Sequence, residues 1–301
     1  MEMKKYKDIE RLKTEHIELF CKEHDIVVQE KLDGANFSIR YDLETDRILS
    51  FSRKKQLHEL ETLRGAWNWS QTLDRNLVKK VLGNNKILFG EWLVPHTIKY
   101  DEEDYNKAYF YDVFDLEKGT YLKQDEVEQI VKELNLNYVP VFYKGKFQSW
   151  EHLKQFVGQT QMHCEQGEGI VVKNMSKLNS YKTLYVKIVT EHFSETKSIK
   201  KVNLEDIQKK NELQILVETV VTKARIIKIL HKMVDEGLIP ENFNEQSLSV
   251  IGKNIGKDVY YDCVKEESDV VEQVGYKFGQ IAHKIAMKIA RDYILEREDV
   301  V

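Results

Sequence analysis

The first residue of interest is a lysine placed where it could act as a nucleophile. Lys31 follows a strand-like run at 26–30 and precedes Asp33-Gly34, a dipeptide typical of tight turns, with a second strand-like run behind it. We expect this lysine at the mouth of a hairpin, where partial removal from water lowers the pKa of its amine. Only the neutral amine attacks, so this setting suits covalent catalysis. Taken alone, the string fits an ordinary hairpin with a solvated lysine equally well.

Further residues of chemical interest stand at the ends of other strand-like runs. Glu91 follows a glycine at the end of KILFGEW, and Tyr111 lies in the aromatic run AYFYDVFDL. Glu168 and Lys173 begin and end the run EGIVVK, and Lys187 ends LYVK. Together with the candidate nucleophile they supply two carboxylates, an aromatic surface and two cations. Each also has a purely structural explanation, as a solvated acid, a core tyrosine or an edge-strand charge.

The runs that carry these residues predict a mixed α+β fold. Between residues 26 and 188, segments rich in Val, Ile, Tyr and Phe are separated by turn residues, which is typical of strands, and helices are expected at 72–81 and 123–134. After residue 203 the apolar residues take helical spacing. We expect one helix over about 216–234, ended by Gly237 and Pro240, and a last helix over about 270–296. The predicted domains are 1–200 and a small all-helical domain at 201–301.

The composition is that of an ordinary globular protein. The chain has 301 residues, 42% of them hydrophobic and 32% charged, with a formal net charge of −4. No run approaches the roughly 18 apolar residues of a membrane span, and the charged start of the chain lacks the apolar core of a signal peptide. Three scattered cysteines argue against a disulfide framework and for a reducing compartment. We expect an intracellular protein, cytoplasmic or otherwise, that is neither secreted nor bound to a membrane.

In order and spacing, the candidate residues resemble the motifs of the covalent nucleotidyltransferases, a superfamily of RNA ligases, DNA ligases and mRNA capping enzymes. The resemblance covers about residues 26–197 and implies a nucleotidyltransferase domain of antiparallel sheets with flanking helices. The sequence looks most like the RNA ligase 2 branch, on three details: Glu30 before the lysine, Asn36-Phe37 after it, and the Phe-Ser-Glu string at 193–195. The helical continuation fits this branch, because a DNA ligase or capping enzyme normally continues with a β-barrel.

The resemblance implies a reaction in three phosphoryl transfers. Lys31 would take AMP from ATP as a lysyl-AMP phosphoramidate, AMP would pass to a 5′-phosphate end, and a 3′-hydroxyl would displace it to seal the strand. The implied cofactors are ATP, as AMP donor, and Mg²⁺ or Mn²⁺. The implied partner is nucleic acid, either RNA or a nicked duplex with an RNA 3′-hydroxyl. We expect a monomer that acts in RNA repair or nick sealing.

The resemblance also implies a role for each motif residue. Glu91 would hold the ribose hydroxyls, Tyr111 would stack on adenine, and Arg53 would contact the nucleotide phosphate and the 5′-phosphate end. Glu168 would bind the metal, largely through its water shell. The remaining implied site residues are catalytic or line the nucleotide: Asp33; Lys173 and Lys187, which would neutralise phosphate charge; Asn36, which would act after Lys31 is charged; and Glu30 and Leu32, which flank the nucleophile.

Two positions depart from the pattern of the relatives. Phage relatives have histidine where Asp33 stands, although aspartate is the commoner choice across the superfamily. The last motif of many relatives has two lysines flanking one residue, whereas here Tyr185 takes the first place and only Lys187 matches. The missing charge would slow one step, or Lys182 or Lys197 would supply it.

Two features of the last third have alternative explanations. The string from Gly252 to Lys257 faintly resembles a phosphate loop, but it lacks one spacer and the Ser/Thr, and a glycine-containing helix connection explains it as well. The helices also carry basic residues that form either a solvated face or a track for a nucleic-acid backbone: Lys223, Arg225, Lys228, Lys232, Lys277, Lys284 and Lys288.

Rival functions follow from the same motifs. A capping guanylyltransferase would use GTP, and the helical tail and Asn36-Phe37 count against it. A DNA ligase is disfavoured by the same tail. A binding module that kept the fold and lost turnover is favoured only by Tyr185, because the motif lysines and glutamates are intact.

Overall fold

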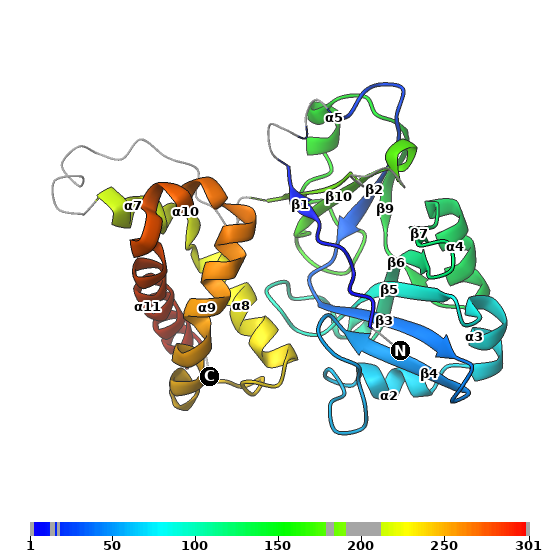
Figure 1. The fold of residues 1–301 in the computed structure, drawn as a ribbon, viewed down its shortest axis with the longest axis horizontal. Helices are drawn as coiled ribbons and strands as arrows, with labels where there is room; N and C mark the ends of the chain where they lie inside the picture. The colour runs from blue at the N-terminus through cyan, green and yellow to red at the C-terminus, as the bar shows by residue number, and fades with distance from the viewer. Residues whose placement is uncertain (1–2, 13–15, 17–18, 179–183, 191–211, 299–301) are drawn as a thin grey trace. The chain divides into compact units, whose positions relative to one another are not determined.

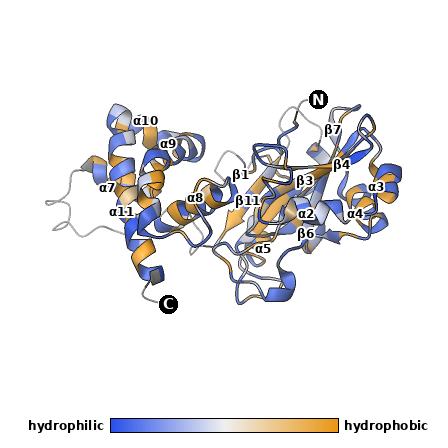
Figure 2. Ribbon diagram, turned by 90° about the horizontal axis from the view of Figure 1, so that it is seen from below, coloured by the Kyte–Doolittle hydropathy of each residue, from blue (hydrophilic) through white to orange (hydrophobic). Residues whose placement is uncertain are grey.

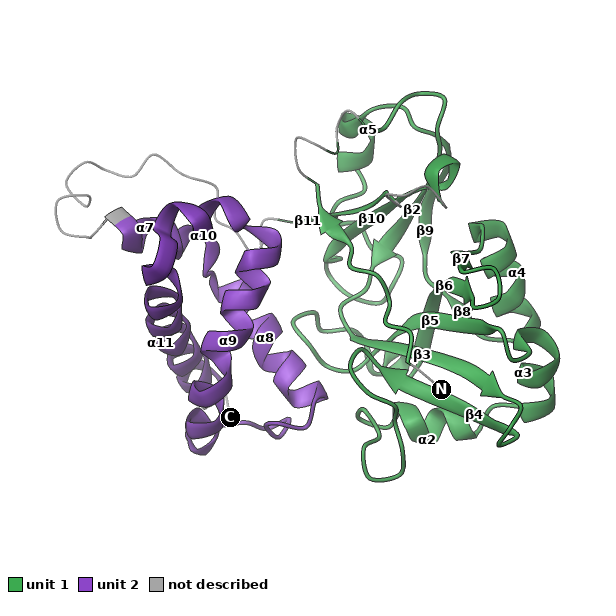
Figure 3. Cartoon of the chain, in the orientation of Figure 1, with its two compact units in different colours: residues 1–190 green, residues 191–301 purple. Residues whose placement is uncertain are grey.

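The chain divides into two units, residues 1–190 and 191–301 (Figure 3). A computed structural model describes residues 3–12, 16, 19–178, 184–190 and 212–298. The predicted domain boundary between residues 200 and 201 lies outside the described residues, as do the Phe-Ser-Glu string at 193–195, Lys182 and Lys197.

The first unit is built on two mainly antiparallel sheets, as predicted (Figure 1). The five-stranded sheet has the order β1-β11-β10-β2-β9, and the six-stranded sheet has the order β4-β3-β5-β6-β7 with β8 beside β6. Only β1 with β11 and β8 with β6 run parallel among the described strands. The strands are β1 (Glu10–Arg11), β2 (Asp25–Lys31), β3 (Ala35–Asp42), β4 (Arg47–Ser52), β5 (Lys86–Trp92), β6 (Ala108–Asp115), β7 (Thr120–Tyr121), β8 (Asn137–Tyr138), β9 (Val141–Lys146), β10 (Gly169–Asn174) and β11 (Tyr185–Val189).

Each sheet buries its apolar face against helices. The six-stranded sheet packs on α2 (Ala66–Gln71), α3 (Arg75–Leu82) and α4 (Gln124–Glu133), with Phe37 and Trp92 in its core. The five-stranded sheet packs its apolar side chains around α5 (Trp150–Lys154). The described part of this unit also contains the short helices η1 (Glu102–Asp104) and η2 (Met175–Lys177). Because side chains alternate along a strand, the opposite faces of the two sheets carry the polar residues, together with a smaller apolar cluster that includes Phe89, Phe114 and Tyr185.

Lys31 does not lie in a hairpin, and that prediction was wrong. β2 ends at Lys31 in the five-stranded sheet, whereas β3 begins at Ala35 in the other sheet. At Gly34, a Cβ would lie 2.6 Å from the carbonyl oxygen of Trp92, so the crossing chain has room only for glycine. The Asp-Gly dipeptide therefore carries the chain from one sheet to the other.

The second unit is all-helical in its described part, as predicted. In Figure 2, hydrophobic and hydrophilic colours alternate along these helices, as expected for helices with one buried side. A single apolar cluster, with Ile251, Ile255, Phe278 and Ile294 among its members, holds them together. The elements are α7 (Glu212–Val220), α8 (Lys223–Asp235), η4 (Glu245–Ser247), α9 (Leu248–Glu266), α10 (Ser268–Val274), η5 (Gly275–Lys277) and α11 (Phe278–Glu298).

Both helices predicted in this unit are broken. The predicted helix over 216–234 is α7 and α8, because the hydroxyl of Thr222 accepts a hydrogen bond from the backbone N–H of Arg225 and starts a new helix. The predicted helix over 270–296 is α10 and α11, separated at Gly275, whose φ of 66° is outside the helical range. Apolar spacing continues across both breaks, which is why periodicity alone missed them.

The glycines at 252 and 256 lie inside α9, neither in a phosphate loop nor in a helix connection. A Cβ built on Gly252 would lie 3.6 Å from Met287, and one on Gly256 would lie 2.6 Å from the ring of His283. The two glycines therefore let α9 and α11 approach closely along an antiparallel seam.

No helix among the described residues is both long and apolar enough to cross a membrane. Cys21, Cys164 and Cys263 are all free.

Candidate active site

The candidate nucleophile is held by a carboxylate. Lys31 ends β2 opposite Gly169 of β10, and its Nζ donates a hydrogen bond of 2.6 Å to Oε2 of Glu168. The two side chains are 20% and 8% exposed, so the pair lies at the edge of the interior with one side open. The structure thus brings together two of the predicted site residues that are far apart in the chain.

Cations from two further strands share this sheet face. Lys187 of β11 pairs in register with Val171 of β10, and Lys173 pairs with Tyr185. Residues two apart on a strand point to the same side, so Lys31, Lys173 and Lys187 all point away from the apolar core. Lys187 is only 7% exposed.

The six-stranded sheet contributes the second group of side chains. Asn36 of β3 pairs directly with Glu91 of β5, and its Nδ2 donates a hydrogen bond of 2.7 Å to the hydroxyl of Tyr111. The register of β5 and β6 shifts between Phe89 and Gly90, so that Tyr111 is an extra residue on β6. Such a bulge redirects side chains, and here it lets Tyr111 and Asp112 both reach the polar side of the sheet.

Glu91 is electrostatically coupled to the nucleophile. Burial raises the pKa of Glu91 to about 7, the charges of Lys31 and His96 oppose this rise, and Glu168 and Asp33 add to it. Burial, with the nearby carboxylates of Glu91 and Asp112, also raises the pKa of the Tyr111 phenol well above its usual value, while the charge of Arg53 lowers it. These charges therefore act on one another across both sheets.

Asp33 holds a loop. Its Oδ2 accepts hydrogen bonds of 2.7 and 2.8 Å from the backbone N–H groups of Thr97 and Ile98, and its own N–H donates to the hydroxyl of Tyr100. Burial would raise the pKa of Asp33, but His96, whose Nδ1 lies 3.6 Å from Asp33 Oδ1, and the hydrogen bond from the N–H of Ile98 outweigh burial and hold the pKa well below the usual range. The geometry therefore gives Asp33 a positioning role beside Lys31, and its predicted part in catalysis stays a prediction.

Lys173 is buried away from the nucleophile. It is 1% exposed and Asp112 is 0% exposed, and the Lys173 Nζ donates 2.9 Å to Asp112 Oδ2 and 2.8 Å to the carbonyl oxygen of Tyr111. Burial lowers the pKa of Lys173, and Asp112 counteracts this. Its predicted contact with phosphate stays a prediction, because its ammonium is engaged by Asp112.

The side chains of Glu30, Leu32 and Arg53 stand apart from the Lys31–Glu168 pair. Glu30 points to the opposite sheet face, where it accepts 2.6 Å from Thr160 Oγ1 and 2.9 Å from the N–H of Gln161, and Leu32 is buried. Arg53 follows β4 and forms an ion pair with Asp8, with 45% of its side chain exposed. Only the backbone of Glu30 and Leu32 adjoins the nucleophile.

Several residues of the site had no place in our sequence-based prediction. Asp112 is the centre of a buried network in which Tyr6, Gln124, Lys173 and Tyr185 all donate to its carboxylate. A signal for Asp112 was available, because an acid inside an aromatic strand needs a buried partner. No local signal pointed to Tyr6, which reaches Asp112 from 106 positions away.

Among the described residues, no group of three or more His, Cys, Asp or Glu is arranged to hold a metal ion. The donor set near the nucleophile is the carboxylate of Glu168, with that of Glu91 nearby. Such a sparse set fits a divalent ion that keeps most of its waters, as Mg²⁺ does.

A family model described as RNA ligase matches residues 24–189. The chain belongs to the RNA ligase family. This confirms the family resemblance, and every predicted site residue from Glu30 to Lys187 lies inside the matched range, whereas the Phe-Ser-Glu string at 193–195 lies outside it. No curated protein sequence matches the chain.

Solved RNA ligases from Naegleria gruberi are similar to this family member. One, a variant solved without ligand, has a TM-score of 0.48 at 21% identity, covering 64% of this chain and 57% of that one. Another, a variant solved with AMP and manganese, has a TM-score of 0.49 at 22% identity, covering 64% and 57%. A third, with ATP and manganese, has a TM-score of 0.45 at 20% identity, covering 62% and 56%. The chain spans a little over half the length of these ligases.

Proposed function

We propose that this member of the RNA ligase family is an ATP-dependent RNA ligase that carries AMP on Lys31. The observation that carries the proposal is the 2.6 Å contact between the Lys31 ammonium and Glu168, beside Glu91 and the Asn36–Tyr111 pair. A partly exposed lysine amine is thereby fixed next to carboxylate, amide and aromatic groups of the kind that bind a nucleotide.

The proposed first step transfers AMP to the lysine. Lys31 must lose a proton before it attacks, and Glu168 is the carboxylate within hydrogen-bond distance of that proton. The amine then forms a bond to the α-phosphorus of ATP, and the bond to pyrophosphate breaks. Lys187, buried on the same sheet face, would neutralise phosphate charge as it moves.

In the second proposed step Lys31 is the leaving group, and in the third step it forms no bond to the reacting groups. A 5′-phosphate oxygen takes AMP from Lys31, and the 3′-hydroxyl then attacks the activated phosphate and expels AMP. A divalent ion, Mg²⁺ or Mn²⁺, would be held near Glu168 and would stabilise the charge on the transferred phosphate. We further propose that the protein acts as an intracellular monomer in RNA repair or nick sealing, and the free cysteines support the location.

The outer side of the α9–α11 seam supports a nucleic-acid partner. Lys253 and Lys257 follow the two seam glycines by one position, and Lys284 and Lys288 follow His283 and Met287 in the same way. Because the helices are antiparallel, these positions flank the seam on its solvent side. All four lysines are exposed, and the described residues offer them no ion-pair partner. We call Lys253, Lys257, Lys284 and Lys288 the basic face.

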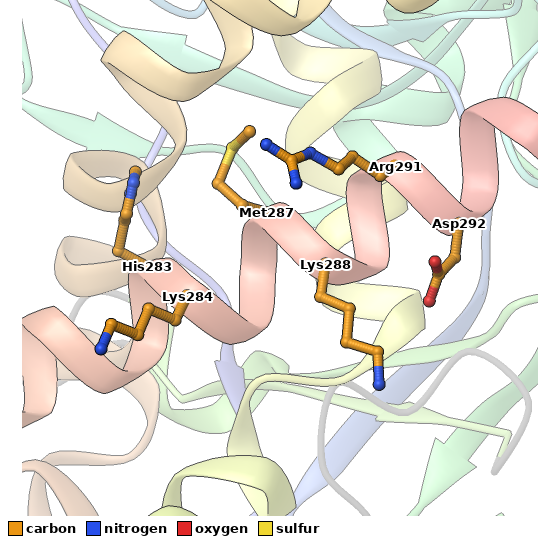
Figure 4. A pocket seen from close by; sticks show the side chains of 6 residues that line it. All are labelled: His283, Lys284, Met287, Lys288, Arg291 and Asp292. Carbon is orange, nitrogen blue, oxygen red and sulfur yellow. The ribbon is translucent and has the colours of Figure 1, made fainter.

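Figure 4 shows part of this arrangement on α11. His283, Met287 and Arg291 project to one side of the helix and Lys284 and Lys288 to the other, around a pocket of about 500 Å³. Tyr261, 61% exposed, continues the α9 row of lysines by one helical turn. Lysine rows that end in an exposed aromatic ring suit a phosphate backbone and an unstacked base.

Other basic residues of these helices, which the sequence left open as a solvated face or a nucleic-acid track, have acidic partners. Lys223 forms an ion pair of 2.5 Å with Glu296, and Lys232 lies 3.8 Å from Asp262. Arg225 is fully buried against Asp262 and Glu267, so its prediction as a solvated or RNA-binding residue was wrong. Arg225 lies on the buried face of α8, so that face of the helix is not available to a ligand.

Labelling with ATP tests the proposal. The purified protein, incubated with Mg²⁺ and α-labelled ATP, should retain label through an acid-labile bond. Lys31→Ala should reduce labelling by more than about 10³-fold, because the nucleophile itself is lost. Lys86→Ala, at the far end of β5 from Glu91, is the matched control and should label normally.

The outcomes separate the rival functions. Label taken only from GTP would replace the ligase with a capping enzyme. No label from ATP, GTP or NAD would favour a binding module without turnover. Sealing of nicked duplexes that differ only in an RNA or DNA 3′-end then measures strand preference, and a preference for DNA ends would overturn the assignment to RNA.

A further inference from the structure

The N-terminal segment at 3–11 contributes to the site although it lies outside the family match at 24–189. β1 pairs parallel with β11, placing Arg11 opposite Lys187. Ahead of it, the ring of Tyr6 packs at 5.1 Å from Phe89 and 5.0 Å from Tyr111. The segment is therefore part of the wall of the candidate site.

Lys7 places an ammonium group inside this wall. Its Nζ lies 3.0 Å from the centroid of the Tyr185 ring and 5.2 Å from that of Tyr121. The atom is buried and has no hydrogen-bond partner among the described residues. Burial lowers the pKa of Lys7 to about 7, with Asp112 raising it and Lys173 lowering it further.

Lys7 differs in this respect from the other cations around it. Lys31 is held by Glu168, Arg53 by Asp8 and Lys173 by Asp112. A buried ammonium without a carboxylate is costly, and a ring face compensates only part of that cost. Among the described residues, the buried Lys7 ammonium has no hydrogen-bond acceptor, and an anionic ligand would supply one.

We propose that Lys7 binds the phosphate chain of ATP, supplying from outside the family match the cation that Tyr185 does not provide. The inference rests on the proposed ligase function. Tyr185 stands two positions before Lys187 on β11, where many relatives have a second lysine. The ring of Tyr185 would hold the Lys7 ammonium near the position where those relatives have their second lysine. Lys7 would then supply the positive charge that the motif lacks.

A rescue experiment tests this role. Lys7→Met keeps an unbranched side chain only one atom shorter and removes its charge, and should lower kcat/KM for self-adenylylation by about 10- to 100-fold, mainly through KM for ATP. Lys7→Met combined with Tyr185→Lys should recover most of the loss. Lys4→Met is the matched control, because Lys4 lies 4.2 Å over the ring of Phe114 but is exposed, and it should react normally.

The pH profile gives a second readout. Lys7 is a cation below its pKa of about 7, so KM for ATP should rise with pH above that value in the wild type and stay flat in Lys7→Met. Normal kinetics in Lys7→Met, or a loss that Tyr185→Lys does not restore, would overturn the inference. A wild-type protein that takes no label would instead overturn the proposed function.

Discussion

The candidate site of the first unit and the basic face of the second both depend on lysines, but their surroundings are opposite. In the site, Lys31 and Lys173 lie against carboxylates at 2.6 and 2.9 Å, and Lys173 is 1% exposed. On the basic face the lysines project into solvent from two helices, with no acidic partner in the part of the chain that the structure describes.

The contrast separates two uses of positive charge. A buried pair fixes a geometry, because loss of either member leaves an uncompensated charge in a medium that solvates it poorly. An exposed and unpaired row is weakly positioned but attracts a polyanion over a distance set by salt. Chemistry on a phosphorus atom needs the first arrangement, whereas gathering a long substrate needs only the second.

The largest expected effect concerns the buried pair. Asp112→Asn should destabilise the first unit by about 3–5 kcal/mol, because Lys173 then stays buried without a counter-ion. All four tryptophans lie in the first unit, so urea unfolding followed by their fluorescence reports on this unit alone. Asp25→Asn, which opens an exposed pair with Lys146 at 2.9 Å, should cost less than about 1 kcal/mol.

The Asp112 result has an internal check. If the ion pair is the cause, Asp112→Asn with Lys173→Met should be more stable than Asp112→Asn alone. If the losses of unfolding free energy in the two single variants simply add in the double variant, the buried ion pair has no special effect on stability. The contrast between buried and exposed charges would then be wrong.

A pH effect of intermediate size is expected from Glu91. Its pKa is about 7 in the fold against 4.5 as its ordinary value, so between these values the folded state keeps a proton that the unfolded state has lost. This group therefore reduces stability as pH rises from about 4.5 to about 7, by on the order of 2 kcal/mol. Glu91→Gln should remove that loss from a series of urea titrations, and the exposed control Glu128→Gln should keep it. An unchanged slope in Glu91→Gln would mean that Glu91 is ionised throughout.

The smallest effect for each residue is expected on the basic face. Changing all four of its lysines to Gln should weaken RNA binding by about 10- to 100-fold near 0.1 M salt and flatten the dependence of log affinity on log salt. Labelling by ATP should not change, because the proposed catalytic groups lie in the other unit. Lys223→Gln with Lys232→Gln, which removes paired lysines, is the control. Equal losses in both sets would show that net charge, rather than the unpaired rows, governs binding.

Much of the candidate site could be predicted because its residues sit in short motifs with fixed spacing. The α+β class and the helical second unit follow from periods of two and 3.6 residues, and the antiparallel sheets were implied by the family resemblance. The pairing of Lys31 with Glu168, by contrast, depends on β2 lying beside β10, which no local pattern specifies. The hairpin prediction failed for the same reason, since an Asp-Gly dipeptide does not reveal which sheet receives the next strand.

Other features were missed because they depend on three-dimensional contacts. Apolar spacing runs through Thr222 and Gly275, so a hydroxyl cap and a positive φ ended helices that periodicity continued. The role of Gly252 and Gly256 becomes visible only when α11 lies against them. Lys7 belongs to no sequence motif, and the side chains around it are contributed by β6, β7, β10 and β11.

The distance along the chain between Lys31 and Glu168 has a consequence for synthesis. The two residues are 137 positions apart, and β1 must also wait for β11 before it can pair. Such long-range contacts form late and slowly. A nascent chain on the ribosome therefore holds its lysine without the neighbouring carboxylate until nearly the whole first unit has been made, and unfinished chains should consume no ATP.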